Sequence, residues 1–332
     1  MQKFATNDIA VIGIDIGGTK VSAALFGPNG DILQKEIQPV AERKGTQVID
    51  LISALALSLI DSAVDLDYRV KAIGACVPGI YNPANKTAWA PNIPDWNHIQ
   101  LWEELRQRID HPSINIVIES DRSCYILGEV WKGCAKGCSD AIFMAVGTGI
   151  GAGILSNGRI VSGRSGIAGS IGWLALEPPY HRKYQPMGNF EHYASGHGIT
   201  RSTIEVLSRD RETVSELDAV PRNKITSHHI FQAFENQDPV AIEVMDKAVL
   251  YWGMVVANLV SIFNPQKVIL GGGVFGPAAQ LKDKIFEEAK KWAQPLSIQE
   301  TSLEVSTLKG DAGLIGAGYL AIKSLNNQAH AE

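Results

Sequence analysis

The stretch Asp15-Ile16-Gly17-Gly18-Thr19-Lys20 combines an acid, a glycine turn, a hydroxyl and a cation. Asp15 can hold Mg²⁺, directly or through water, and Lys20 supplies positive charge. Gly18 and Thr19 can approach a phosphate group closely. Phosphoryl transfer depends mainly on positioning and charge neutralisation, and these residues supply both. A plain strand end with a solvated Asp and Lys also fits the pattern, so both interpretations stay open.

Three further glycine clusters follow predicted strands or open a predicted helix: Gly147-Thr148-Gly149, Gly271-Gly272-Gly273 and Gly310-Asp311-Ala312-Gly313. Backbone N–H groups in such loops can hold phosphate oxygens, although a tight turn explains any single one. Several together favour a polyphosphate ligand. None has the GxxxxGK[ST] or the GxGxxG spacing, so we expect neither a P-loop nor a Rossmann nucleotide site.

The elements around two of these loops repeat. The order strand, glycine loop with Thr, strand and Asn-Gly turn occurs twice, in residues 9–30 and again in residues 141–158. A repeat of four parts predicts two related domains that face each other across a cleft, where ligands usually bind. The alternation of strands with helices, such as the long helix predicted for Pro239–Phe263, indicates an α/β architecture.

Asp121 is placed at a strand-to-helix junction. It follows the predicted strand Ile114–Ile118 and begins a helix that we expect to end near Trp131. This position predicts a carboxylate that faces the cleft. An Asp at the start of a helix is ordinarily an N-cap, and the junction alone favours that role.

The composition limits the class of protein. The chain has 332 residues, of which 45% are apolar and 20% charged, and its formal net charge is −5. These values predict a packed globular protein and argue against a general nucleic-acid binder. Residues 1–8 lack the pattern of a signal peptide. The uncharged stretch Ala248–Gln266 contains glycine, asparagine and proline, so we expect a buried core helix and no membrane span.

Four cysteines are too few for a disulfide framework in a chain of this length: Cys76, Cys124, Cys134 and Cys138. Zinc ligation by Cys134 and Cys138 is possible, but two free thiols are the simpler interpretation because no second Cys or His pair lies nearby. Reduced thiols predict a cytoplasmic protein.

Beyond these patterns, the chain resembles the ROK family (repressors, open reading frames, kinases) of the actin/hexokinase superfamily. The matching stretches extend over nearly the whole chain: DIGGTK at Asp15–Lys20, CVPGI at Cys76–Ile80, APNIPDW at Ala90–Trp96, ESD at Glu119–Asp121, GTGIGAGI at Gly147–Ile154, YASG at Tyr193–Gly196, GGGV at Gly271–Val274 and GDAGLIGAG at Gly310–Gly318.

The resemblance implies an ATP-dependent sugar kinase with two actin/hexokinase-like (ribonuclease H-like) α/β domains, residues 1–121 plus 319–332 and residues 122–318. It implies Asp121 as the general base and a homodimeric assembly. It implies Mg²⁺ at Asp15 and a sugar held near Gly79, Asn92 and Glu191. ATP and its phosphates would meet Gly17, Gly18, Thr19, Lys20, Gly147, Thr148, Gly149, Gly271, Gly272, Gly273 and Val274.

Three substitutions depart from the family pattern at positions expected to meet the sugar. Ser120 replaces an Asn, Ser170 replaces a Glu, and Trp173 replaces a His that contacts sugar and zinc in many relatives. The cysteines expected before YASG are also absent, so we expect no structural zinc. Trp173 either stacks on a sugar or aglycone or fills the space left by zinc. We therefore expect free glucose to be a poorer substrate than a modified or glycosylated sugar.

Two alternative functions stay open. A catalytically silent sugar-binding or sensor protein fits the altered pocket, but the retained acids Asp15 and Asp121 and the glycine clusters favour an enzyme. A repressor of the same family carries an added N-terminal helix-turn-helix. The first predicted strand begins near Ile9, so we expect no DNA-binding segment before it.

Overall fold

The computed structural model describes residues 8–329, which form two compact units. Unit 1 contains the chain up to Gly137, the short segment Ser162–Ala168 and the chain from Gly310 onward; unit 2 contains Cys138–Val161 and Gly169–Lys309. Residues 1–7, where the absence of a signal peptide was predicted, lie outside the described part. The two units are described separately.

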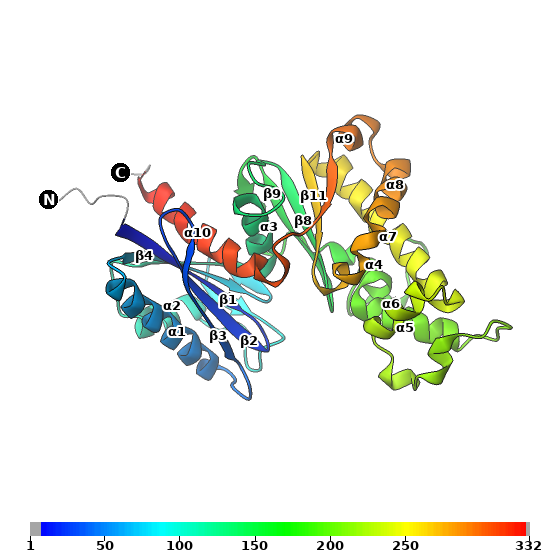
Figure 1. The fold of residues 1–332 in the computed structure, drawn as a ribbon, viewed down its shortest axis with the longest axis horizontal. Coiled ribbons are helices and arrows are strands. Elements are labelled where there is room, and N and C mark those ends of the chain that lie inside the picture. The colour runs from blue at the N-terminus through cyan, green and yellow to red at the C-terminus, as the bar shows by residue number, and fades with distance from the viewer. Residues whose placement is uncertain (1–7, 330–332) are drawn as a thin grey trace. The chain divides into compact units, whose positions relative to one another are not determined.

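Unit 1 contains a five-stranded mixed sheet with the order β3-β2-β1-β4-β7 (Figure 1). The first three strands are antiparallel neighbours, whereas β1, β4 and β7 run parallel. A separate pair, β5 and β6, forms a small antiparallel sheet. The bounds are β1 Ile9–Ile16, β2 Lys20–Phe26, β3 Ile32–Pro39, β4 Arg69–Val77, β5 Ile80–Asn82, β6 Thr87–Trp89 and β7 Asn115–Ser120, with helices α1 Thr46–Asp65, α2 Leu101–Arg108, α3 Asp121–Trp131 and α10 Ala312–Ala329.

Unit 2 repeats this topology. Its sheet has the order β10-β9-β8-β11-β12, again with antiparallel pairing on one side of β8 and parallel pairing on the other. The repeat predicted from the glycine loops is therefore confirmed. The bounds are β8 Ala141–Val146, β9 Ile150–Ser156, β10 Arg159–Ile160, β11 Lys267–Gly271 and β12 Ser302–Val305, with helices α4 Asn189–Ala194, α5 Gly196–Leu207, α6 Ser227–Glu235, α7 Pro239–Phe263, α8 Lys282–Trp292 and α9 Pro295–Glu300.

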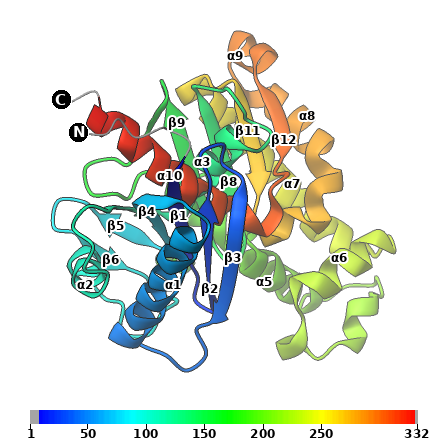
Figure 2. The ribbon, with the colours of Figure 1, turned by 60° about the vertical axis from the view of Figure 1, so that its left-hand side comes forward.

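The two faces of the unit 1 sheet are covered by α1 and α10 (Figure 2). Successive side chains of a strand point to opposite faces, so Ile12 and Ile14 join the core that includes α1, while Gly13 faces α10. A Cβ atom on Gly13 would lie 2.6 Å from the backbone nitrogen of Gly318, and one on Gly74 would lie 2.0 Å from the carbonyl oxygen of Ala317. These glycines allow α10 to approach the strand backbones directly.

The boundary between the units differs from the one expected at residues 121 and 319. Helix α3 packs along α10, and both belong to unit 1. The expected boundary before residue 319 would divide α10 between the two units. The chain therefore enters unit 2 only after Gly137, and all of α10 returns to unit 1.

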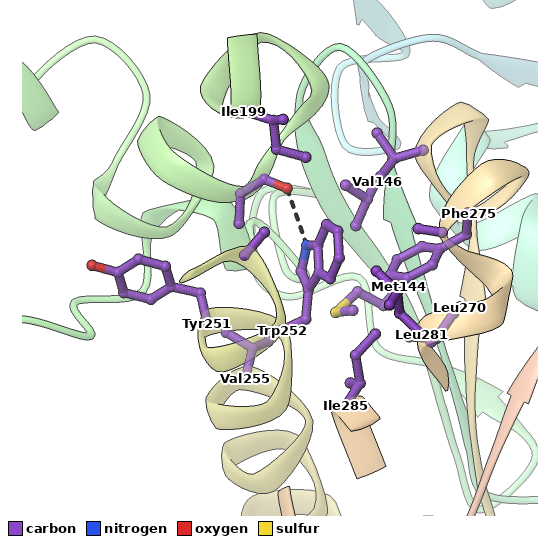
Figure 3. Packing of buried hydrophobic residues seen from close by; sticks show 14 of the residues in the cluster. Met144, Val146, Ile199, Tyr251, Trp252, Val255, Leu270, Phe275, Leu281 and Ile285 are labelled. Atoms are coloured by element: carbon purple, nitrogen blue, oxygen red, sulfur yellow. Dashed lines mark hydrogen bonds between the residues drawn. The ribbon is translucent and has the colours of Figure 1, made fainter. Parts of the chain in front are cut away.

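The core of unit 2 is built around α7, the helix predicted for Pro239–Phe263. Trp252 is fully buried among Met144, Leu270 and Phe275, and its indole N–H donates to the carbonyl oxygen of Ala194 at 3.0 Å (Figure 3). The prediction that Ala248–Gln266 forms a buried helix is confirmed for the part within α7. Asp238 caps the helix by accepting from the N–H groups of the following turn.

Helix α1 is, among residues 8–329, the one helix long and apolar enough to cross a membrane. Nine of its side chains are buried, and it packs on β1, β2 and β4. These contacts identify it as a core helix, because burial against a sheet accounts for its apolar face.

Candidate functional site

The predicted site residues fall into two sets. Unit 1 holds Asp15, Gly17, Gly18, Thr19, Lys20, Gly79, Asn92, Ser120 and Asp121; unit 2 holds Gly147, Thr148, Gly149, Ser170, Trp173, Glu191, Gly271, Gly272, Gly273 and Val274.

Asp15 lies at the end of β1, against the start of α10. The thiol of Cys76 donates to Asp15 Oδ1 at 3.0 Å. A Cβ atom on Gly313 would lie 3.0 Å from the carboxylate carbon and from both oxygens of Asp15. Burial raises the pKa of Asp15, and the Cys76 hydrogen bond and the charge of Lys20 lower it in part. Sequence reasoning did not identify Cys76 or Gly313, although both lie within recognised motifs.

The first glycine loop is a tight turn that also contacts the APNIPDW segment. Gly17 N–H donates to the carbonyl oxygen of Lys20 at 2.9 Å. A Cβ atom on Gly18 would lie 2.8 Å from the carbonyl oxygen of Asn92, and the Asn92 side chain is exposed beside it. Gly79 has no room for a side chain either, because its Cβ atom would lie 2.1 Å from the carbonyl oxygen of Trp89.

Asp121 is the first residue of α3 and does not cap it. The cap is Ser120, whose Oγ accepts from the N–H of Ser123 at 3.3 Å. The N-cap role that the junction favoured for Asp121 is therefore corrected. Ser120 is only 7% exposed, and its hydroxyl also pairs with that of Ser123 at 3.0 Å. This capping role leaves Ser120 a weak candidate for a sugar contact.

The carboxylate of Asp121 is held on two sides. Its Oδ1 accepts from the N–H of Arg122 at 2.7 Å, and its Oδ2 accepts from the hydroxyl of Tyr125 at 3.2 Å. The pKa of Asp121 is raised to about 6, chiefly by burial and to a lesser degree by the negative charge of Asp15, against the lowering effect of Arg122. Tyr125, one turn along α3, was not identified from the sequence, although the i to i+4 spacing is a usable signal.

The negative charge of Asp15 raises the pKa of Asp121, and the negative charge of Asp311 raises the pKa of Asp15. Mg²⁺ is commonly bound through one or two carboxylates together with substrate phosphates. Oxygen ligands that repel one another fit such a cation. Within residues 8–329, no group of three or more His, Cys, Asp or Glu side chains is arranged to hold a metal ion by itself.

In unit 2, the loop Gly147–Gly149 is tied to Glu191. Glu191 Oε2 accepts from the N–H of Ile150 at 2.7 Å, and burial raises the pKa of this carboxyl. Gly149 lies against it, because a Cβ atom there would be 3.0 Å from the same oxygen. Thr148 is exposed at the tip of the loop.

Packing explains some of the glycines in unit 2 and not others. A Cβ atom on Gly271 would lie 2.1 Å from the ring of Phe143, and Gly272 has a φ of 89°. Both positions therefore need glycine for the fold. A Cβ atom on Gly147 or Gly273 would meet nothing within 4 Å. Neither packing nor a positive φ therefore explains why Gly147 and Gly273 are glycines.

Val274, expected beside the nucleotide, is buried, and its Cγ2 would lie 3.5 Å from a Cβ atom on Gly196. Ser170 precedes the short 3-10 helix Ile171–Trp173, and its carbonyl oxygen accepts from the N–H of Trp173 at 3.2 Å. The Trp173 side chain is 57% exposed. Of the two interpretations of Trp173, filling an interior space is therefore the weaker one.

The segment around Tyr184, shortly before the YASG motif, is held partly by aromatic packing. Tyr184 is buried, and its hydroxyl lies 3.0 Å from that of Tyr193. His181 and His192 meet the Tyr184 ring edge to face, at centroid distances of 5.6 and 5.4 Å. The absence of a structural zinc ion stays a prediction.

The topology and the carboxylates at the strand ends are those of an actin/hexokinase-type α/β protein. The chain belongs to the ROK family, whose sequence model matches residues 11–324. It is 30% identical over 323 residues to a glucokinase of Halalkalibacterium halodurans, covering 95% of this chain and 96% of that protein.

Two solved structures show the same fold. The ROK hexokinase of Thermus thermophilus has a TM-score of 0.78 at 26% identity and covers 96% of this chain and 99% of its own. A ROK family glucokinase of Streptomyces griseus, solved in complex with glucose and AMPPNP, has a TM-score of 0.71 at 27% identity and covers 95% and 99%. The expected fold class is therefore confirmed.

Proposed function

We propose that this chain is an ATP-dependent sugar kinase, which transfers the γ-phosphoryl group to a hydroxyl of a hexose or hexose derivative. The observation that carries the proposal is the buried carboxyl of Asp121, with its raised pKa. Its pKa of about 6 keeps it ionised at neutral pH and makes it more basic than an ordinary Asp. Family membership and the named sugar kinases among the relatives support the same function.

Asp121 acts as the general base. Its carboxylate takes the proton of the acceptor hydroxyl as that oxygen forms a bond to the γ-phosphorus and the bond to ADP breaks. Arg122 N–H and Tyr125 hydroxyl hold the carboxylate in one orientation. Ser120 fixes the start of α3, so that the base is presented on a rigid element.

The remaining roles are assigned by residue type. Mg²⁺ neutralises phosphate charge when bound, and Asp15 is the residue that would hold it. The glycine loops at residues 17–19, 147–149 and 271–273 lie against the nucleotide and its phosphates, with the unobstructed Gly147 and Gly273 as the closest approaches. Asn92, Glu191 and the backbone at Gly79 bind the sugar. We further propose a cytoplasmic homodimer.

Asp121→Asn tests the function directly. The amide keeps the shape and removes the basicity, so the rate of phosphoryl transfer should fall at least about a hundredfold while ATP still binds. ADP release measures the rate, and calorimetry measures ATP binding. Asp283→Asn is the matched control, because this side chain is almost fully exposed, and it should change neither quantity.

Two outcomes would contradict the proposal. Near-normal turnover in Asp121→Asn would remove this residue from the mechanism. A wild-type protein that binds sugars but releases no ADP with any hexose, amino sugar, deoxy sugar or disaccharide would favour the catalytically silent sugar-binding protein instead.

A further inference from the structure

Helix α4 in unit 2 is only six residues long, and it carries Glu191, the carboxylate proposed to bind the sugar. Helices as short as this are not stable by themselves, because so few hydrogen bonds do not offset the cost of nucleation. The residue at its N-cap position is Gly188, and no side chain caps the helix. Contacts with neighbouring elements therefore decide where α4 lies and where Glu191 points.

Arg201, on the neighbouring helix α5, makes several of these contacts through one nitrogen atom. Its Nη1 donates to the carbonyl oxygen of His192 at 3.0 Å and to the thioether sulfur of Met187 at 3.3 Å. The same nitrogen lies 3.1 Å from Nδ1 of the His192 ring. Met187 precedes α4 and His192 lies within it, so the guanidinium joins residues on both sides of Glu191 in the sequence.

The protonation of His192 agrees with this arrangement. A guanidinium can only donate, so Nδ1 of the ring accepts from Arg201 and the ring proton is on Nε2. The ring is neutral, because burial together with the charges of Arg201 and Lys183 lowers the pKa of His192 to about 4. His192 is 4% exposed, and its Nε2 has no hydrogen-bond partner within residues 8–329. The polar contact that orients this side chain is therefore the one with Arg201.

The charge of Arg201 also acts on Glu191 directly. Burial raises the pKa of the Glu191 carboxyl, whereas the N–H of Ile150 and the charges of Arg201 and His197 lower it in part. An ionised carboxylate accepts stronger hydrogen bonds from hydroxyl groups than a neutral carboxyl does. Arg201 therefore favours the form of Glu191 that is suited to sugar hydroxyls, in addition to holding the helix that carries it.

We propose that Arg201 is a positioning residue for sugar binding, which holds α4 so that Glu191 presents its carboxylate to the acceptor. The inference rests on the proposed function. Glu191 lies in a close fit, because Cβ atoms on Gly149 and Gly172 would be 3.0 and 2.9 Å from its Oε2. A displacement of α4 by about 1 Å is enough to disturb the contacts that such a carboxylate makes.

Arg201→Met tests the proposal, because it removes the donors and the charge and keeps an unbranched side chain that can pack. The KM for the sugar should rise about tenfold, as expected for the loss of one charge-assisted hydrogen bond. The KM for ATP and kcat should change less than about twofold, since Glu191 holds the sugar equally before and during transfer. ADP release with glucose and, separately, with maltose measures these constants, and both sugars should show the same factor.

Two further variants accompany this test. Arg201→Lys keeps the charge and offers three N–H donors on one nitrogen, but it is shorter, so the KM for the sugar should be about threefold above that of wild type. Arg209→Met is the control from the same part of the chain. Arg209 forms an exposed ion pair with Glu243, and such pairs contribute little, so this variant should keep every wild-type constant.

A wild-type KM for both sugars in Arg201→Met would overturn the proposal and leave the kinase function standing. Equal rises in the KM for sugar and for ATP, or a fall in kcat alone, would also overturn it, because they indicate a general loss of structure. If Arg201→Met does not fold, Arg201→Lys decides: a raised KM for the sugars alone supports the proposal, and wild-type values overturn it. Calorimetry of glucose binding without nucleotide separates the two hypotheses. Weaker binding in Arg201→Met, in a protein that phosphorylates no sugar, would support the role of Arg201 while contradicting the kinase function.

Discussion

The raised pKa of Asp121 lowers the free energy of unfolding at neutral pH. Below about pH 4 the carboxyl is protonated in both the folded and the unfolded chain, so it contributes no difference. Between pH 4 and 6 it ionises first in the unfolded chain. Above pH 6 it is ionised in both states, and the folded state is disfavoured by the shift from 3.8 to about 6. One pKa unit is worth 1.36 kcal/mol, so the cost reaches about 3 kcal/mol.

Asp121→Asn should therefore stabilise the protein while it abolishes transfer. The free energy of unfolding should exceed that of wild type by up to about 3 kcal/mol at pH 8, and the gain should disappear near pH 4. Denaturant unfolding at the two pH values measures it. Asp283→Asn, at an exposed position, should show no gain at either pH. An equal gain at both pH values would mean that ionisation is not its cause.

The sequence located Asp121 correctly at the start of α3 but did not show which residue caps the helix. Ser and Asp are both good N-caps, and they are adjacent here, so residue type alone does not separate them. Residue type alone also does not show which glycines the fold requires. Gly271 is fixed by Phe143 of β8, a contact between strands distant in the sequence, whereas Gly273 is not fixed by any contact. Only the packed sheet distinguishes these two neighbours.

At the scale of elements, the start of α10 is placed to control the orientation of Asp15. A methyl group at Gly313 would press on the whole Asp15 carboxylate. Gly313→Ala should raise the Mg²⁺ concentration needed for half-maximal transfer several-fold, because Asp15 is the proposed Mg²⁺ ligand. The melting temperature should not fall, since alanine is the better helix former.

Gly310 provides the control for this substitution. It precedes α10 by two residues, and a Cβ atom there would meet nothing within 4 Å. Gly310→Ala should keep the wild-type dependence on Mg²⁺. An unchanged Mg²⁺ dependence in Gly313→Ala would mean either that Asp15 moves at no cost or that it does not hold the ion, and the role assigned to Asp15 would be withdrawn.

The sequence predicted long elements with clear signals at their ends. Helix α7 begins at a proline after the capping Asp238 and ends at Phe263, directly before Asn264, which has a left-handed conformation. Short elements such as the helix Ile171–Trp173 have no such signals, and their positions are set by contacts with Glu191 and β9. The exposed position of Trp173 therefore could not be predicted, because it depends on these tertiary contacts.

At the scale of the whole molecule, the duplicated topology was readable from the repeated loops. The return of the C-terminal helix to unit 1 was expected from the family resemblance, and only for residues 319–332. Nothing in the apolar pattern of α10 states which sheet it covers. Gly13 and Gly74 determine this, because their lack of a side chain leaves room for the backbone of α10. Both glycines belong to strands near the other end of the chain. The compact unit is therefore discontinuous in sequence.

This discontinuity predicts how the chain can be divided. Residues 1–137 alone should not fold cooperatively, because the sheet face under α10 would expose Val11, Phe26 and Ala72 to water. Joining residues 310–332 to Gly137 through a flexible glycine–serine linker should restore a cooperative thermal transition, since Leu314, Ala317 and Ala321 then cover that face. Circular dichroism during heating measures both fragments. A linked fragment in which these three residues are replaced by Asp is the control and should behave like residues 1–137 alone. A cooperative transition in residues 1–137 without α10 would show that the sheet and α1 suffice, and that the helix only docks on a unit already folded.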